Sequence, residues 1–428
     1  MKEQILATTA DFGVMGAVSG FFSDLFSSAT GILICIVLAL IIVLVLYVVV
    51  KRIKHKINVN QEKRSLKEDL MIWSNLSNLV SGGKKTKKGK EKLTGEFALI
   101  KGIFDSATKT IKTKCFRKQN TPWYVVVGEP LSGKSSLLET KSLDYEKIGA
   151  KTDSDKDILQ FYANQYRVML DINGKVFFDH WLGGGSAKWT IIAEQIYKYH
   201  KNKPLSGIIL TIPADALVAD DKKLALKKAS LIASELANLQ NVLKMHIPCR
   251  IVVTKCDCIL GFREFFSSIS SDLKDQPLGF EISDYFNIEE ELPQKWSNFV
   301  NRIKSGNSAL LGANTALALT FETKKRLEKT AYIYSFSEQL DALYDNLKIY
   351  VTTILQHNNS NIFTVPEGVY FTSCMDQGVV FDRDFANYQG KKVEDAVMVS
   401  NKANNMSLFV HDLFLNYFDR LSKKSTFT

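Results

Sequence analysis

The 428-residue sequence has little of what marks several common protein classes. Its eight prolines leave little room for a long extended linker, and its six scattered cysteines do not resemble a secreted disulfide framework. The six histidines show no ligand spacing, and Cys256 and Cys258 have no partner pair nearby, so no zinc site is expected. With 46% hydrophobic and 23% charged residues, the chain is neither disordered nor fibrous.

Excess basic charge is also missing from most of the chain. The formal net charge is +10, but thirteen basic and four acidic residues between positions 51 and 92 account for +9 of it. The rest of the chain is close to neutral, unlike many nucleic-acid binders, which are basic throughout. We therefore expect no nucleic acid as a partner.

Residues 31–50 are twenty apolar residues without a charged side chain. A helix of this length rises about 30 Å, which matches the hydrocarbon core of a bilayer. Basic residues follow directly at 51–56, and by the positive-inside rule they favour a cytoplasmic location for residues 51–428. Residues 12–28 are moderately apolar and predict either an interfacial helix or a second span.

The sequence therefore predicts a membrane region at 1–50, with a transmembrane helix at 31–50. A basic juxtamembrane helix and linker is expected at 51–92, where the charge either attracts anionic lipid or only solvates a spacer. Beyond it we expect a P-loop NTPase-like domain at 93–275. The remaining residues, 276–428, are expected to form a helical extension with two late strands.

After residue 93, short β-rich runs alternate with longer helical stretches, which predicts an α/β fold with a doubly wound sheet. The aromatic-rich run 406–421 predicts a packed helix, with a docking helix for a partner or membrane as the alternative. Strands are expected at Trp123–Val127, Val176–Phe178, Gly207–Ile212, Arg250–Thr254, Tyr332–Phe336 and Val369–Thr372, and helices at 134–145, 186–201, 222–245, 261–273 and 337–356.

The run GEPLSGKS matches the phosphate-binding pattern G-x-x-x-x-G-K-[ST] and follows the apolar run WYVVV. Gly128 and Gly133 would let the backbone wrap closely around phosphates, and a helix opening at Ser136 would aim free N–H groups at them. Lys134 and the Ser135 hydroxyl are placed for the β- and γ-phosphates and for Mg²⁺. The strand before and the helix after favour a true P-loop over a glycine–serine turn with a surface lysine.

Two further signals follow in the order of GTPase-like folds. The run VFFD ends at Asp179, whose carboxylate could hold Mg²⁺ through water. Thr254-Lys255-Cys256-Asp257 matches [NT]-K-x-D, in which the aspartate accepts two hydrogen bonds from guanine and the lysine stem packs on the base. The alternative for Asp257 is a helix N-cap.

The run after Asp179 is irregular for a GTPase. The Mg²⁺ aspartate usually continues as D-x-x-G, whereas Asp179 is followed by His-Trp-Leu-Gly, with the glycine one residue late. No glutamine or arginine is evidently placed to orient water or to stabilise the transition state. The sequence therefore supports binding of ATP or GTP with Mg²⁺ better than fast hydrolysis.

Four runs together resemble the cytoplasmic N-terminal part of the IcmF/TssM family, inner-membrane proteins of type VI secretion systems. They lie in the family's order, and the last two are not general features of P-loop proteins. Where the family typically has D-T-A-G-R-Y, this chain has the irregular run after Asp179. The four runs are WYVVVGEPLSGKSSLL, GIILTIPADAL, PCRIVVTKCDCILGFREFF and EGVYFTSCMDQG.

The resemblance implies an inner-membrane scaffold of a bacterial secretion complex, present as an oligomer. The partners that it implies are a DotU/TssL-like membrane subunit and baseplate proteins, with membrane lipid contacted through residues 51–92. The alternative is a membrane-anchored GTPase with a regulatory or targeting role. That reading rests on Lys134, Ser135, Asp179, Lys255 and Asp257 alone, and in it the chain would be a slow hydrolase of GTP or ATP.

Overall fold

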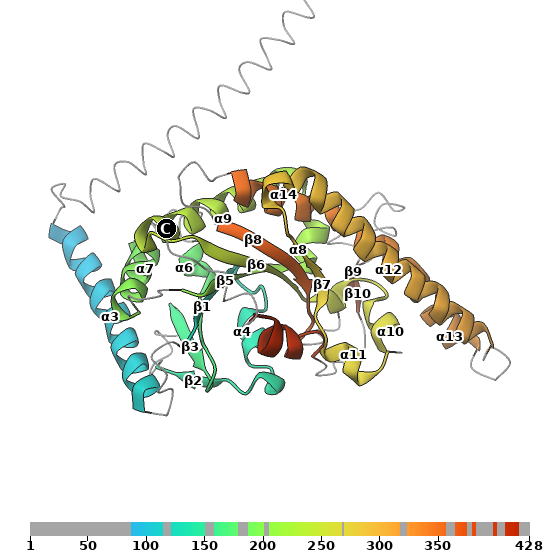
Figure 1. Ribbon diagram of the computed structural model, residues 1–428, viewed down its shortest axis with the longest axis horizontal. Helices are drawn as coiled ribbons and strands as arrows, with labels where there is room; N and C mark the ends of the chain where they lie inside the picture. Colours follow the sequence, from blue (N-terminus) through green and yellow to red (C-terminus); the bar gives the residue numbers. More distant parts are fainter. Residues whose placement is uncertain are drawn as a thin grey trace, which may run out of the picture. The chain divides into compact units, whose positions relative to one another are not determined.

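A computed structural model of the chain has an α/β fold, built around one eight-stranded sheet (Figure 1). The chain divides into two compact units, Met1–Lys90 and Glu91–Thr428, and the sheet belongs to the second. The structure describes residues 87–113, 121–149, 158–178, 187–200, 205–267, 269–316, 323–356, 364–374, 379–381, 397–399 and 407–418.

The sheet has the strand order β2-β3-β4-β1-β5-β6-β8-β7. Its centre is parallel and consists of β4 (Val168–Ile172), β1 (Trp123–Gly128), β5 (Gly207–Pro213), β6 (Ile247–Thr254) and β8 (Thr364–Phe371). Antiparallel strands form both edges, namely β2 (Glu146–Ile148) with β3 (Leu159–Ala163) beside β4, and β7 (Leu278–Glu281) beside β8. A separate antiparallel pair is formed by β9 (Val379–Phe381) and β10 (Val397–Val399).

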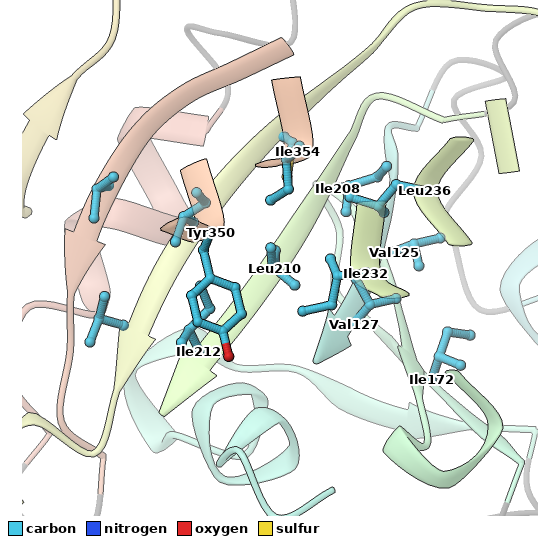
Figure 2. Close-up of a cluster of buried hydrophobic side chains, with 14 of the residues drawn as sticks. Val125, Val127, Ile172, Ile208, Leu210, Ile212, Ile232, Leu236, Tyr350 and Ile354 are labelled. Atoms are coloured by element: carbon cyan, nitrogen blue, oxygen red, sulfur yellow. The ribbon is translucent and has the colours of Figure 1, made fainter. Parts of the chain in front are cut away.

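One face of the sheet is covered by α3 (Lys87–Thr113), α7 (Ala187–Tyr199), α9 (Lys222–Leu243) and α14 (Tyr344–Gln356). Alternate residues of each strand point to opposite faces, so Val125 and Val127 of β1 lie under these helices while Tyr124 and Val126 do not. Figure 2 shows side chains of α9 and α14 packed over β1 and β5. Burial on both faces explains why β1, β5 and β6 consist mostly of apolar residues.

The opposite face carries the short helix α4 (Lys134–Leu138) and, from the C-terminal segment Leu408–Phe418, the part from Val410 onward, which includes the helical turn Leu413–Tyr417. Phe414 and Phe418 are fully buried there, in one cluster with Leu137 and Leu138 of α4. The tyrosines of the strands in this cluster are Tyr124, Tyr162 and Tyr370. For the described residues 407–418, the prediction that this run packs on the domain is confirmed.

The remaining helices lie at the ends and edges of the sheet. They are α6 (Gly174–Phe177), α8 (Ala214–Ala219), α10 (Phe262–Ser267), α11 (Ser271–Asp275), α12 (Ile288–Ala316) and α13 (Thr323–Asp341). Short 3₁₀ turns occur at Lys141–Leu143, Cys256–Cys258 and Tyr285–Asn287. The expected boundary at residue 275 falls just before β7, which pairs with β8 inside the same sheet.

Two expected strands are helical, because short apolar runs do not distinguish a strand from a buried helix. Residues 176–177 lie in α6, whose N-cap Asn173 accepts a hydrogen bond from the backbone N–H of Lys175 at 2.9 Å. Residues 332–336 lie inside α13, where Ile333 and Phe336 are buried three residues apart. The α/β class is as predicted, and the sheet is mixed, because β2, β3 and β7 run antiparallel to their neighbours.

The expected transmembrane helix is not supported. Within the ranges that the structure describes, every helix is too short or too polar to cross a bilayer. Residues 31–50, on which that expectation fell, lie outside those ranges, as do residues 12–28 and the basic stretch up to residue 86.

The placement of the C-terminal segment predicts that Phe414→Ala destabilises the chain by about 3–5 kcal/mol, the usual cost of removing a fully buried ring. Urea unfolding of the full chain measures this change in the free energy of unfolding. The matched control is Phe286→Ala, because the Phe286 ring is 80% exposed and its loss should cost less than about 0.5 kcal/mol. Similar small losses in both variants would contradict this placement.

Candidate functional site

The predicted phosphate-binding loop connects β1 to α4 at the carboxyl end of the sheet's centre. β1 ends at Gly128, where a Cβ atom would overlap both the side chain and the carbonyl of Thr211 on β5. Gly133 is the N-cap of α4 and has a left-handed backbone with φ of 79°, which favours glycine. Both glycines of the motif are therefore required by the local geometry, as the sequence predicts.

Lys134 folds back over its own loop. Its Nζ donates hydrogen bonds to the carbonyl oxygens of Gly128 at 3.1 Å and Glu129 at 2.7 Å, and to Ser132 Oγ at 3.2 Å. Burial lowers the pKa of Lys134 to about 8, because the ammonium loses its water. The loop thus holds a positive charge at its centre. Ser136 follows in the first turn of α4, where its carbonyl accepts a hydrogen bond from Thr140.

Ser135 is tied to a carboxylate on the neighbouring strand. Its Oγ donates to Asp171 Oδ2 at 2.6 Å, and Asp171 stands on β4 in register with Val126 of β1. The other oxygen, Asp171 Oδ1, is buried and has no hydrogen-bond partner among the described residues. Burial also raises the pKa of Asp171 to about 6. A hydroxyl and a carboxylate with an available oxygen fit Mg²⁺, which prefers oxygen ligands.

Asp171 was missed by the sequence analysis, which assigned the Mg²⁺ carboxylate to Asp179. Asp179 lies outside the described residues, whereas the structure brings Asp171 to Ser135. The run Asp171-Ile172-Asn173-Gly174 has the regular D-x-x-G spacing, and a Cβ on Gly174 would overlap the backbone of Glu129 and Pro130. The irregular spacing after Asp179 therefore does not apply to the aspartate at the P-loop.

The second predicted loop follows β6 and meets the P-loop. Thr254, the last residue of β6, donates from Oγ1 to the carbonyl oxygen of Ser132 at 2.5 Å. Lys255 comes next in a left-handed conformation with φ of 55°, and its Nζ pairs with Asp215 Oδ2 at 3.0 Å. The hydrogen bond from Thr254 to Ser132 places Lys255, the lysine of the base-reading motif, beside the P-loop.

Asp257 is buried, with 4% of its surface exposed. Its Oδ1 accepts a hydrogen bond from Ser373 Oγ at 2.7 Å, and its Oδ2 lies 3.7 Å from Arg263 Nη2. The helix N-cap alternative does not hold, because Asp257 lies inside the 3₁₀ turn that Lys255 caps. Ser373 was another residue that the sequence analysis did not single out, although it belongs to the run EGVYFTSC just after β8.

The structure thus brings the P-loop, Asp171 and the Lys255–Asp257 loop together at the carboxyl ends of the central strands. They follow or end β1, β4 and β6, which are parallel strands, and the carboxyl ends of parallel strands are where α/β sheets bind ligands. Lys134 supplies a cation for phosphate, and Ser135 and Asp171 supply oxygens for a divalent metal, whereas the oxygens of the buried Asp257 face Ser373 and Arg263. A cation for phosphate and oxygen ligands for a metal are the groups that a site for a nucleoside triphosphate with Mg²⁺ requires.

Comparison with known proteins identifies the family. The model for the IcmF-related N-terminal domain matches residues 184–418, which is more than half of the chain. The type VI secretion system component TssM1 of Pseudomonas aeruginosa is 24% identical over 311 residues, which cover 68% of this chain. The chain spans 27% of the length of that relative.

Among solved structures, the small COPII coat GTPase SAR1 from Encephalitozoon cuniculi in complex with GDP is 11% identical. The match covers 44% of this chain and 63% of that chain, with a TM-score of 0.23, which is too low to carry an argument. The family match begins at residue 184, after the P-loop, so the assignment of the P-loop rests on its geometry. On the strength of the family match, this chain belongs to the IcmF/TssM family.

Proposed function

We propose that the chain is a nucleotide-binding component of a type VI secretion complex, with ATP or GTP and Mg²⁺ held at the P-loop. The observation that carries this proposal is the contact of Ser135 with Asp171 at 2.6 Å, which leaves Asp171 Oδ1 buried without a partner among the described residues. A buried polar atom without a partner costs free energy. A divalent cation beside Ser135 would remove that cost.

The charges at the loop support the same proposal. Burial lowers the pKa of Lys134 and raises that of Asp171, so the folded chain disfavours both charged forms. A triphosphate would add negative charge beside the Lys134 ammonium, and Mg²⁺ would add positive charge beside the Asp171 carboxylate, which would favour both charged forms. Both ligands together therefore fit this loop better than either does alone.

Turnover is proposed to be slow. The regular D-x-x-G at Asp171–Gly174 favours a GTPase-like phosphate site, and this spacing now supports the alternative of a GTPase. The residue after Gly174 is the exposed Lys175. A lysine side chain has no hydrogen-bond acceptor with which to orient an attacking water molecule. We therefore favour a binding module over a fast hydrolase.

At the level of the complex, we propose a scaffold role at the bacterial inner membrane. The proposed partners are a DotU/TssL-like membrane subunit and baseplate proteins, with anionic lipid near residues 51–92. Family membership and the basic charge of residues 51–92 support this part of the proposal.

Lys134→Ala should weaken nucleotide binding at least about tenfold, because it removes the buried ammonium of the loop. Titration of the purified full chain with a fluorescent GTP or ATP analogue in Mg²⁺ measures the affinity. The matched control is Lys222→Ala, because the Lys222 side chain on α9 is 75% exposed and pairs with Asp345 at 2.8 Å. Equal affinity in the wild type and Lys134→Ala would contradict nucleotide binding at this loop.

The scaffold role predicts that the tagged chain co-purifies with a DotU/TssL-like subunit from detergent-solubilised membranes of a bacterium that produces both. Quantitative mass spectrometry of the purified complex measures the enrichment of that subunit. The control is a preparation from cells that lack the tagged chain. Absence of the DotU/TssL-like subunit from preparations that retain other members of the complex would contradict the scaffold role.

A further inference from the structure

A carboxylate outside the predicted motifs holds the lysine of the base-reading loop. Asp215 is the second residue of α8, directly after β5, the strand between β1 and β6. Its Oδ2 accepts a hydrogen bond from Lys255 Nζ at 3.0 Å, and its Oδ1 accepts one from the backbone N–H of Ala216 at 2.9 Å. With both oxygens engaged, the carboxylate has a fixed orientation toward Lys255.

Lys255 needs such an anchor. Its left-handed backbone, with φ of 55°, costs a non-glycine residue about 1–2 kcal/mol. Its side-chain stem lies beside the N-terminus of α4, since Lys255 Cγ would be 3.9 Å from a Cβ built on Gly133. Strained residues persist only where the surrounding structure holds them. The hydrogen bond to Asp215 holds the far end of this side chain.

The helix that carries Asp215 is itself fixed. Asn346 of α14 donates hydrogen bonds to the carbonyl oxygens of Leu217 at 2.9 Å and Asp220 at 2.8 Å, in and just after α8. Asp220 also pairs with Lys228 at 2.7 Å. Asp215 therefore projects from a supported element, which is what a residue that positions another side chain requires.

We propose that Asp215 is a positioning residue for the base-binding side of the nucleotide site, a role that rests on the nucleotide-binding function proposed above. It holds the Lys255 stem where a purine base packs on it, and it contacts neither the P-loop lysine nor Ser135. The Asp215 side chain is 31% exposed and that of Lys255 is 20% exposed, so their ion pair contributes little to stability. Its role is to orient Lys255. Substitution of Asp215 should therefore weaken binding of the base and leave binding of the phosphates unchanged.

Inorganic tripolyphosphate separates these two halves of the ligand, because it carries the phosphates without a base. Isothermal titration calorimetry of the full chain in Mg²⁺ would compare GTP, ATP and tripolyphosphate on the wild type and on Asp215→Asn. Asparagine keeps the shape of the side chain and can still accept from the Ala216 N–H, but it loses the charge. We expect the affinity for the nucleotides to fall about tenfold, with tripolyphosphate binding unchanged.

A double-variant cycle tests whether Asp215 acts through Lys255. Lys255→Met keeps an unbranched apolar stem without the ammonium, so adding Asp215→Asn to it should cause no further loss of nucleotide affinity. A further loss in that background would overturn the proposal. Unchanged tripolyphosphate binding also shows that each variant is folded, and Asp215→Glu, which retains the charge, should recover part of the lost affinity.

The outcomes distinguish this proposal from the one on which it rests. If the wild type binds all three ligands and Asp215→Asn loses them equally, loses none or gains affinity, the positioning role is wrong while nucleotide binding stands. If the wild type binds none of them, the nucleotide-binding proposal fails and the positioning role fails with it.

Discussion

The parallel pairing of β1 with β4 on one side and β5 on the other is the constraint on which the site depends. It sets Val126 in register with Asp171 and Gly128 in register with Thr211. Because parallel strands end at the same edge of a sheet, the P-loop after β1 must meet the carboxylate at the end of β4. The hydrogen bond of Ser135 to Asp171 is the direct result.

The C-terminal segment supports the site by packing on α4, on the face of the sheet opposite α9 and α14. Phe414 packs in one cluster with Leu137 of α4, the helix that begins at Lys134. Leu408 and Ser373 exchange two backbone hydrogen bonds, at 2.7 and 3.3 Å, and the side chain of Ser373 then holds Asp257. The segment thus contacts elements on both the phosphate side and the base side of the site, although it lies far from either in the sequence.

The glycine-rich loop between β1 and α4 could be predicted from the sequence because all of its parts are contiguous. Gly128, Gly133, Lys134 and Ser135 stand in one run, and their spacing carries the chemistry directly. The loop at Lys255 is equally local, so its residues also appear at the predicted end of a strand. Four of the six predicted strands correspond to strands of the sheet for the same reason, since each is a single apolar run.

Residues that depend on pairing between distant segments could not be found in this way. Asp171 reaches Ser135 because β4 pairs with β1, and neither β4 nor its antiparallel partner β3 was predicted. The sequence instead predicts a strand in the apolar run ending at Asp179, whose residues 176–177 fold as α6. Asp215 is likewise brought to Lys255 by the pairing of β5 with β6.

The central claim is that Ser135 and Asp171 hold the divalent metal of a bound nucleotide. The most direct measurement is electron paramagnetic resonance of Mn²⁺, as a substitute for Mg²⁺, in the presence of a non-hydrolysable nucleoside triphosphate. The account predicts that the wild type and Asp179→Asn bind Mn²⁺ together with the nucleotide, and that Ser135→Ala and Asp171→Asn do not. Full Mn²⁺ binding by Asp171→Asn, with its loss in Asp179→Asn, would contradict the account.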